Sequence, residues 1–411
     1  MNPTAPKHQF VNPFNIEDTE LVIGGLKLSR LAQRVGQTPF YAYDRQLLNA
    51  RIAELRQNMP PELKIHYAMK ANPMPAIVQH MATIVDGFDL ASAGEMKVAL
   101  DTVMPATQIS MAGPGKRPAE LGQAIAAGIT INVESQQELN VIAALSEQTG
   151  IQANVALRIN PAFELKASGM KMGGGPKQFG IDEELIPTVL QHIKSLDLHF
   201  KGFHIYSGSQ NLKAESIIDA QQKSIQLAVS LTEHCPSPIE KLNIGGGFGI
   251  PYFPGDVPLD TRPIGDALAE AINQSKSQLP EAEIIIELGR YLVGEAGIYA
   301  SQVIDKKISR GQIYLIVDGG LHHHLAASGN FGQVIRKNYP VAIGNKMGIE
   351  EMETVNIVGP LCTPLDILAD KVPLPKAEIG DYVVIFQSGA YGLTASPTAF
   401  LTQPNAEEIL V

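Results

Sequence analysis

The regular alternation of short apolar stretches with longer helix-like stretches between residues 65 and 287 constrains the fold more than any other feature of this chain. The apolar stretches are typical of buried strands, and the stretches between them are typical of helices. Eight such strands are what a closed parallel barrel needs, and roughly 250 residues is its usual size. The sequence therefore predicts an α/β chain built around a TIM-like (β/α)8 barrel. The predicted strands lie at 65–69, 87–91, 109–112, 129–133, 155–159, 200–206, 241–244 and 283–287, and the predicted helices at 75–82, 93–100, 118–127, 136–149, 183–195, 214–234 and 264–278.

The rhythm stops after about Tyr291, where short apolar stretches are separated by Gly, Pro and Asn. This pattern predicts a second, mostly β domain, with strands at 301–307, 312–317, 354–359, 382–387 and 399–401. A strand at 40–44 and a helix at 45–58 lead into the barrel, and the segment before Phe40 is expected to join the β domain. We expect the barrel domain to span 37–288 and the β-rich domain to comprise 1–36 and 289–411.

Composition and charge exclude several classes of protein. The net charge of −10 argues against a protein that binds nucleic acid or an anionic membrane surface. The two cysteines, Cys235 and Cys362, are far apart in sequence, so we expect a reducing compartment and no disulfide framework. Residues 1–14 lack the apolar core of a secretory signal, and no stretch has the apolar length of a membrane span. These features predict a cytoplasmic protein.

Lys70 ends the first predicted barrel strand, where a core strand has no hydrophobic reason to carry a lysine. Asn72 and Pro73 follow it, and they end strand pairing and begin a helix. In one interpretation the stem of Lys70 packs while its ammonium group reaches water, which is the commoner situation for a single strand-end lysine. In the other, Lys70 is desolvated enough to form a Schiff base with an aldehyde cofactor.

Polar residues gather at the predicted strand ends, which meet at one rim of a parallel barrel. A glycine-rich run at 245–249 follows the seventh strand, and Arg290 follows the eighth. Backbone amides in such a run approach an anion closely, and an arginine binds two phosphate oxygens at once. A glycine run alone is more often a tight turn, but this position is the usual phosphate site of such barrels. The other polar residues at or near strand ends include Asp89, Lys116, Glu134, Arg158, Asn160, His204, Ser207 and Glu287.

Glu287 and His204 extend the pattern at this rim. The buried carboxylate of Glu287 needs a partner, which can be a protonated pyridine nitrogen or, alternatively, Arg290 or Arg158. His204 is either an ordinary core histidine or a residue that stacks on a planar ring. Lys70, Glu287, His204, the glycine run and Arg290 together describe a site for pyridoxal 5'-phosphate.

Several motifs in a fixed order resemble those of the fold-type III pyridoxal phosphate-dependent decarboxylases, which are the ornithine, arginine and diaminopimelate decarboxylase superfamily. The resemblance covers nearly the whole chain and rests on YAMKAN at 67–72, FDLAS at 88–92, RINP at 158–161, GGG at 245–247, ELGR at 287–290 and SGAY at 388–391. The stretches 170–180, 317–324 and 359–364 resemble a narrower branch. That branch includes the exosortase A system-associated decarboxylases, which look closest, and enzymes that decarboxylate carrier-protein-bound glutamate or siderophore intermediates.

The resemblance implies a role for each residue around the cofactor. Lys70 would carry pyridoxal phosphate as a Schiff base, Glu287 would bond its pyridine nitrogen, and His204 would stack on its ring and act in catalysis. The phosphate would be held by Ser207, Gly247, Arg290 and Tyr391, and the cofactor site would be completed by Asp89, Arg158, Gly246 and Gly289.

The resemblance also implies a homodimer with shared sites, to which the β-rich domain contributes. Cys362 would reach into the neighbouring subunit's site and protonate the reacting carbon, and Thr363 and Asp366 would contact the substrate there. In the diaminopimelate branch a Glu occupies the position of Thr363 and helps to read the distal part of the substrate. Its absence puts a diamino acid substrate in doubt.

Three remaining features lead to further expectations. The glycine-rich loop 162–180 is expected to be a lid or a docking surface for a larger substrate. The histidines at 322–324 are not expected to bind one metal ion, because consecutive strand residues point to opposite faces. Lys116 is expected to be solvated or to meet an acidic substrate or carrier protein.

The predicted activity is α-decarboxylation of an amino acid, or of an amino-acid moiety of a larger conjugate that is free or bound to a carrier protein. Lys70 would hold the cofactor, CO₂ would leave, and Cys362 would supply the proton. An amino-acid racemase with the same cofactor is one alternative, and a non-catalytic regulatory protein that binds the cofactor is another.

Overall fold

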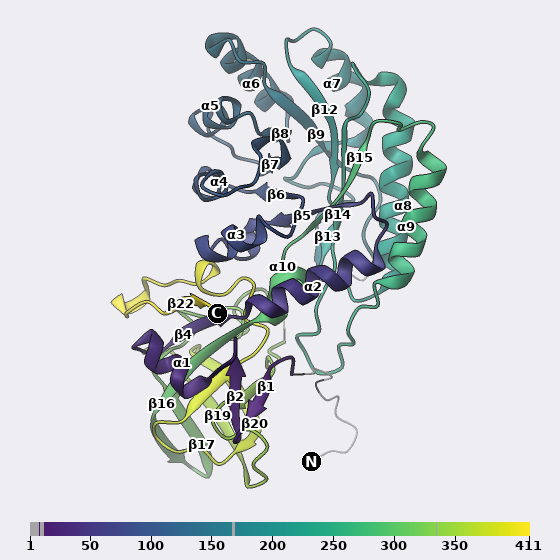
Figure 1. Ribbon diagram of the computed structural model, residues 1–411. Helices are drawn as coiled ribbons and strands as arrows, with labels where there is room; N and C mark the ends of the chain where they lie inside the picture. The colour runs from purple at the N-terminus through teal and green to yellow at the C-terminus, as the bar shows by residue number, and fades with distance from the viewer. Residues whose placement is uncertain (1–7, 9–11, 167–168, 334) are drawn as a thin grey trace. The chain divides into compact units, whose positions relative to one another are not determined.

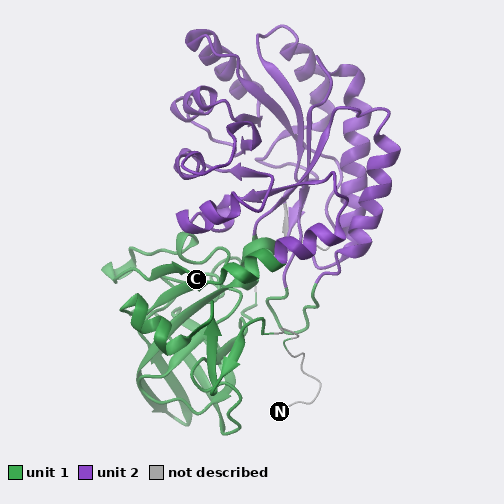
Figure 2. Cartoon of the chain, viewed as in Figure 1, with its two compact units in different colours: residues 1–50, 251–258, 290–411 green, residues 51–250, 259–289 purple. Residues whose placement is uncertain are grey.

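The computed structural model describes residue 8 and residues 12–166, 169–333 and 335–411 of the chain (Figure 1). The chain forms two compact units (Figure 2). The barrel unit contains residues 51–250 and 259–289, and the β unit contains residues 1–50, 251–258 and 290–411.

Eight parallel strands close the barrel of the barrel unit (Figure 1). Their order is β9-β12-β14-β15-β5-β6-β7-β8, and β8 pairs with β9 to close the ring. All eight predicted strands are confirmed, with ends that differ by at most two residues. They are β5 Lys64–Ala68, β6 Gly87–Leu90, β7 Ile109–Met111, β8 Thr130–Val133, β9 Asn154–Asn160, β12 His199–Ile205, β14 Lys241–Gly246 and β15 Glu283–Leu288.

Helices between the strands cover the outside of the barrel (Figure 1). Their ends follow local sequence signals: the hydroxyls of Ser92 and Ser135 accept first-turn amide hydrogens of α4 and α6, and Gly128 and Gly150 end α5 and α6 in the left-handed conformation. The predicted helices are confirmed. They are α3 Pro75–Met81, α4 Ala93–Leu100, α5 Pro118–Ala127, α6 Gln136–Thr149, α7 Ile186–Ile193, α8 Ala214–Leu231 and α9 Arg262–Ser275.

The β unit contains an eight-stranded sheet. Its main path runs β18-β21-β16-β17-β19-β20, and β4 and β22 are joined to it through β16. A small antiparallel sheet of β1 Asn15–Glu17, β2 Glu20–Ile23 and β3 Leu26–Lys27 packs with helix α1 Leu28–Val35 in the same unit. The larger sheet consists of β4 Phe40–Tyr43, β16 Gly297–Ser309, β17 Gln312–Val317, β18 Val341–Ile343, β19 Met352–Val358, β20 Ile367–Pro375, β21 Tyr382–Ile385 and β22 Glu407–Leu410.

The β unit differs from the sequence-based expectation in three respects. The predicted strand at 399–401 is wrong, because Phe400–Thr402 is a 3-10 turn in which Leu401 and Thr402 have positive φ. Strands β18, β20 and β22 were not predicted, and the prolines and charges of β20 hide its alternation. The unit boundary also differs from 37, because β4 pairs with β16 and β22 and so lies in the β unit.

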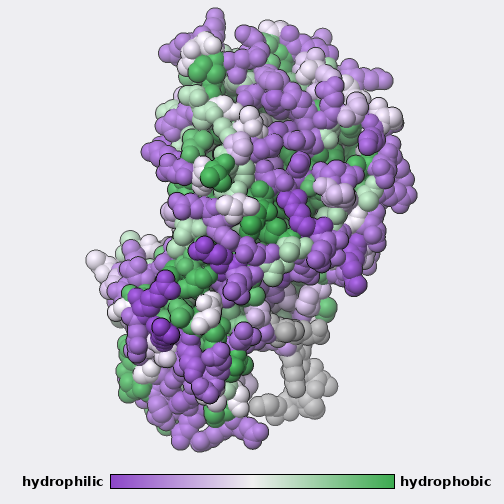
Figure 3. Space-filling model, in the orientation of Figure 1, coloured by the Kyte–Doolittle hydropathy of each residue, from purple (hydrophilic) through white to green (hydrophobic). Residues whose placement is uncertain are grey.

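No helix in the described ranges is both long and apolar enough to cross a membrane. On the face shown in Figure 3, polar residues predominate and apolar residues occur in small groups.

Candidate active site

Lys70 lies in a single 3-10 turn, η1 Met69–Ala71, directly after barrel strand β5. Its neighbours Met69 and Ala71 are buried, whereas the Lys70 side chain is 43 % exposed. Gly289 makes room for this turn, since a Cβ at Gly289 would lie 2.9 Å from the Cβ of Ala71. Strand β5 therefore presents one accessible amine at the rim of the barrel.

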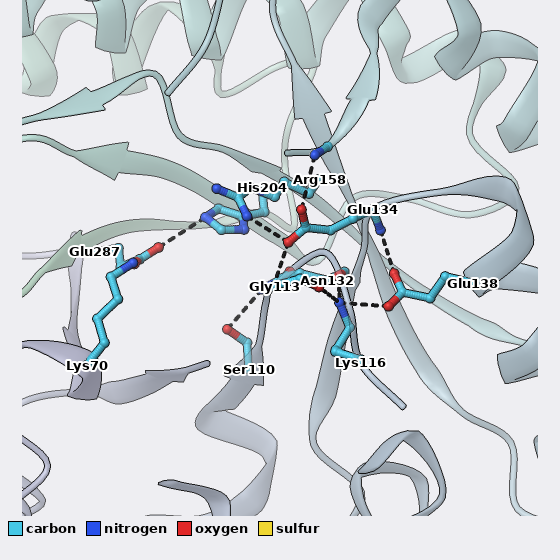
Figure 4. A network of polar contacts seen from close by, with 11 residues as sticks. Lys70, Ser110, Gly113, Lys116, Asn132, Glu134, Glu138, Arg158, His204 and Glu287 are labelled. Carbon is cyan, nitrogen blue, oxygen red and sulfur yellow. Dashed lines mark hydrogen bonds and ion pairs between the residues drawn. The ribbon is translucent and has the colours of Figure 1, made fainter. Parts of the chain in front are cut away.

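Glu287 and His204 lie beside this amine (Figure 4). The Lys70 Nζ is 3.4 Å from Glu287 Oε1, and His204 Nε2 is 3.0 Å from Glu287 Oε2. Burial alone would raise the pKa of Glu287, but the attraction of Lys70 and the hydrogen bond with His204 hold this pKa well below its usual range. Glu287 is therefore an ionised carboxylate in a buried position, and its partners are Lys70 and His204 rather than an arginine.

The glycine run is tightly enclosed between strands. A Cβ at Gly246 would lie 2.3 Å from the carbonyl oxygen of Glu287, and one at Gly245 would lie 2.8 Å from the carbonyl oxygen of Ile205. Gly245 and Gly247 also have φ near +70° and +80°, which favours glycine. Gly246 is in register with Glu287, so the run reaches the same rim as the carboxylate.

Ser207, Asp89 and Arg158 occupy three further positions around the barrel. The carbonyl oxygen of Ser207 accepts hydrogen bonds from the amides of Met172 and Gly173 in the loop 162–180. Asp89 is buried, with its Oδ2 3.4 Å from His66 Nδ1. Arg158 is also buried.

In the β unit, the Arg290 guanidinium lies over two aromatic rings. Its Cζ is 4.8 Å from the centroid of Tyr391 and 5.7 Å from that of Tyr252. Tyr391 has a positive φ of 54°, which is uncommon for a tyrosine. Arg290 and Tyr391, which were predicted to bind the same phosphate, therefore lie together.

Cys362 lies in a loop of the β unit that Asp366 holds in place. Cys362 is exposed, whereas Asp366 is buried. The two carboxylate oxygens of Asp366 accept hydrogen bonds from the amides of Leu321 at 2.6 Å and Leu361 at 2.9 Å. Within this chain Asp366 thus supports the loop beside Cys362, and its contact with a substrate in the partner's site stays a prediction. Thr363 is half-buried, and its amide donates to Leu361 within the same loop.

The histidines 322–324 lie in a turn, not in the strand that the prediction assumed. His323 Nε2 lies 2.7 Å from the carbonyl oxygen of Pro404, and His324 Nε2 lies 2.9 Å from the hydroxyl of Ser388. Burial lowers the pKa of His324 to about 3. These contacts make His323 and His324 structural residues of the β unit. Both ring nitrogens of His322 are buried and lack a hydrogen-bond partner among the described residues.

Sequence reasoning misjudged or missed three residues. Lys116 was expected to be solvated, but its side chain is buried and lies 2.8 Å from Glu138. Glu134 was noted only as a strand-end residue, although it is the ion-pair partner of Arg158 at 2.6 Å. Arg336 has buried Nε and Nη2 atoms that lack a partner among the described residues. The residues around Arg336 in the sequence form no pattern that would predict a buried guanidinium group.

A family model for the pyridoxal-dependent decarboxylases, pyridoxal binding domain, matches residues 45–294. The chain therefore belongs to the pyridoxal-dependent decarboxylases, and its cofactor is pyridoxal phosphate. Among its relatives, the L-glutamyl-[BtrI acyl-carrier protein] decarboxylase of Niallia circulans is 39% identical over 91% of this chain and 89% of the relative. A 2-[(L-alanin-3-ylcarbamoyl)methyl]-2-hydroxybutanedioate decarboxylase of Staphylococcus aureus is 31% identical over 90% of this chain and 93% of the relative.

Solved structures support the same assignment. Diaminopimelate decarboxylase from M. jannaschii in complex with L-lysine has a TM-score of 0.88 and 27% identity, and the match covers 97% of this chain and 93% of that one. The predicted fold, superfamily and enzyme class are thus confirmed: the chain is an amino-acid decarboxylase. The assignment to the exosortase-associated group stays a prediction.

The residues at the barrel rim fit pyridoxal phosphate. The accessible amine of Lys70 and the imidazole of His204 each lie within hydrogen-bonding distance of the ionised carboxylate of Glu287. In the described part of the chain, His204 Nδ1 is buried and has no hydrogen-bond partner. The glycine run leaves no room for side chains, as a close approach of backbone to phosphate requires.

Proposed function

We propose that this protein decarboxylates an amino-acid moiety that is carried on a larger conjugate, as a cytoplasmic homodimer with shared active sites. The observation that carries the proposal is the group formed by Lys70, Glu287 and His204, in which a single accessible lysine meets a buried, ionised carboxylate.

Each residue of this group has a separate task. Lys70 would be the amine that holds the aldehyde carbon, Glu287 would pair with the pyridine nitrogen, and His204 would contact the ring. The bound cofactor supplies an electron sink for the electron pair that remains when CO₂ leaves the substrate. The phosphate is assigned to Ser207, Gly247, Arg290 and Tyr391, and the remaining contacts to Asp89, Arg158, Gly246 and Gly289.

Cys362 is assigned as the proton donor to the substrate carbon that has lost CO₂, acting in the partner's site. Its exposure supports this role, because a thiol that serves another subunit must lie at the surface of its own. Two apolar residues near Cys362 are also exposed, as a subunit contact would require. Leu365 lies three positions after Cys362 in the same loop. Phe331 follows Asn330, whose Nδ2 donates a hydrogen bond to the carbonyl oxygen of Leu365.

Replacing Cys362 by alanine should lower turnover by about 10²–10⁴-fold, because a positioned general acid contributes that much. Cofactor absorbance should stay unchanged, which separates this effect from a loss of binding. An unchanged rate of CO₂ release in Cys362→Ala would remove Cys362 from the mechanism.

Mixing Cys362→Ala subunits with Lys70→Ala subunits tests whether the sites are shared. In a mixed dimer one site keeps both Lys70 and Cys362, so random mixing should restore about a quarter of wild-type activity. Each variant refolded alone is the control. If mixing restores nothing while dimers form, Cys362 acts within its own subunit or not at all.

Two observations favour a conjugated substrate with an acidic group. The Niallia circulans relative acts on a glutamyl group of an acyl-carrier protein, and the Staphylococcus aureus relative acts on 2-[(L-alanin-3-ylcarbamoyl)methyl]-2-hydroxybutanedioate. Thr363 leaves the site without the acidic residue that a diamino acid would need.

The substrate is tested by measuring CO₂ release from free glutamate, diaminopimelate and a glutamyl group tethered to a carrier protein. We expect the tethered glutamyl group to have a kcat/KM at least about 10²-fold above that of the free amino acids, a difference of roughly 2.7 kcal/mol. Lys70→Ala with the same substrates is the control for uncatalysed loss of CO₂. A preference for free diaminopimelate would overturn the proposed substrate while leaving the decarboxylase assignment intact.

A further inference from the structure

Glu134 is a buried carboxylate that receives hydrogen bonds from three separate parts of the barrel rim (Figure 4). It directly follows strand β8, and its side chain is 3 % exposed. One oxygen, Oε1, accepts from Arg158 Nη1 at 2.6 Å and from the Gly113 amide at 2.5 Å. The other, Oε2, accepts from the Gly180 amide at 3.1 Å. One side chain therefore joins strand β9, the loop after β7 and the end of the loop 162–180.

Arg158 is held from a second side by the same loop. Its Cζ lies 4.9 Å from the ring centroid of Phe179, the residue before Gly180. Gly180 cannot be replaced without displacing the backbone, because a Cβ there would lie 2.9 Å from the Asn160 amide nitrogen. Arg158 and the loop end thus both bind the carboxylate of Glu134, and they also contact each other through Phe179.

Glu134 is itself fixed by a brace of buried groups (Figure 4). Its backbone amide donates to Glu138 Oε2 at 2.7 Å, and Glu138 Oε1 lies 2.8 Å from Lys116 Nζ. Lys116 in turn donates to the carbonyl oxygens of Gly113 and Asn132. Because every polar group of this brace is paired, Glu134 has little freedom to turn away from Arg158.

The opposite part of the loop 162–180 is tied to the predicted phosphate end of the site. The amides of Met172 and Gly173 donate to the carbonyl oxygen of Ser207, and Asn211 Nδ2 donates to the carbonyl oxygen of Lys166. The backbone amide of Asn211 also donates a hydrogen bond to the carbonyl oxygen of Gly247. The loop therefore extends from the Ser207 and Gly247 side of the rim to the Arg158 side.

We propose that Glu134 is a positioning residue that sets Arg158 and residues 169–180 in one arrangement, so that the order of residues 169–180 and the binding of pyridoxal phosphate depend on each other. The inference rests on the proposed assignment of Arg158, Ser207 and Gly247 to the cofactor. Glu134 touches neither the amine nor the reacting carbon, so its effect passes through Arg158 and Gly180.

Replacing Glu134 by glutamine tests this coupling with almost no change in shape. A carboxylate accepts from all three donors, whereas an amide has one accepting oxygen and turns its NH₂ group toward an N–H donor. The holoenzyme of Glu134→Gln should show a pyridoxal phosphate dissociation constant raised about tenfold or more, measured by equilibrium dialysis. Amide hydrogen exchange in a peptide covering 176–182 should become faster in the same protein.

Two variants control the experiment. Glu147→Gln makes the same change at an exposed position of helix α6 and should leave both readouts at wild-type values. Glu134→Asp keeps the charge and should recover part of the cofactor affinity, and it serves as the test if Glu134→Gln does not fold.

Faster exchange of the loop with an unchanged dissociation constant would overturn the coupling, and no change in either readout would overturn the positioning role. Both results can be distinguished from a failure of the proposed function. If the proposed function were wrong, the wild-type protein itself would not retain the cofactor, or Lys70→Ala would retain it as the wild type does.

Discussion

Lys70→Ala is expected to lose the visible absorbance band of the covalently held cofactor and to decarboxylate at least about 10³-fold more slowly than the wild type. Loss of a covalent catalytic group costs this much or more in other enzymes. Lys70 is the accessible amine of its turn and lies 3.4 Å from Glu287, so no other residue of η1 can replace it. Absorbance spectra and CO₂ release on the purified variant measure both effects.

Lys64→Ala is the matched control for this experiment. Lys64 begins the strand that Lys70 follows, and it is partly exposed at the opposite end of β5. Its removal should change neither the absorbance band nor the rate. A wild-type protein that shows no cofactor band, or a Lys70→Ala protein that keeps it, would contradict the assignment of Lys70.

Glu287→Gln is expected to keep the cofactor band and to lower kcat by about 10²–10³-fold. A fixed charge aimed at a reacting centre is worth this much. Glutamine has nearly the same shape, but it carries no charge to pair with a protonated pyridine nitrogen, so the electron sink weakens while the cofactor stays bound. Glu283→Gln, at the start of the same strand, is the control and should behave as the wild type.

The pH dependence of the wild type provides a second test of Glu287. The attraction of Lys70 and the hydrogen bond with His204 outweigh burial and hold the pKa of Glu287 below its ordinary value of 4.5. The ionised form therefore stabilises the folded protein above about pH 4.5, and this contribution is lost as pH falls through the lower, folded-state pKa. A loss of kcat between pH 7 and 5 that disappears in Glu287→Gln would mean that Glu287 takes up a proton in this range. That result would contradict a pKa of Glu287 below 4.5.

Much of the fold was predictable, because each barrel strand and helix carries a local signal. Ser92 and Ser135 mark helix starts, Gly128 and Gly150 mark helix ends, and the barrel strands are short stretches rich in apolar residues. The β unit was harder to predict, since β20 combines two prolines with the charged pair Asp370 and Lys371 and lacks a clean alternation.

The candidate site was predictable at the level of residue types and less so at the level of contacts. The barrel rule places Lys70, His204 and Glu287 at one rim, and the structure brings these three together. The same rule left open whether Glu287 pairs with an arginine, and the family resemblance, not the rule, implied a substrate contact for Asp366. In the structure Asp366 is taken up by two backbone amides of its own unit.

The sequence by itself determined the (β/α)8 barrel, the position of Lys70 at a strand end and the family. Periodicity, capping residues and ordered motifs are local properties, and they can be read without knowing which strands are neighbours. Only the tertiary structure decided that Glu287 meets Lys70 and His204, and that Arg158 belongs to Glu134. The paired residues are separated in the sequence by 217 positions for Lys70 and Glu287, 83 for His204 and Glu287, and 24 for Glu134 and Arg158. These contacts therefore depend on strand order and register, which no local pattern specifies.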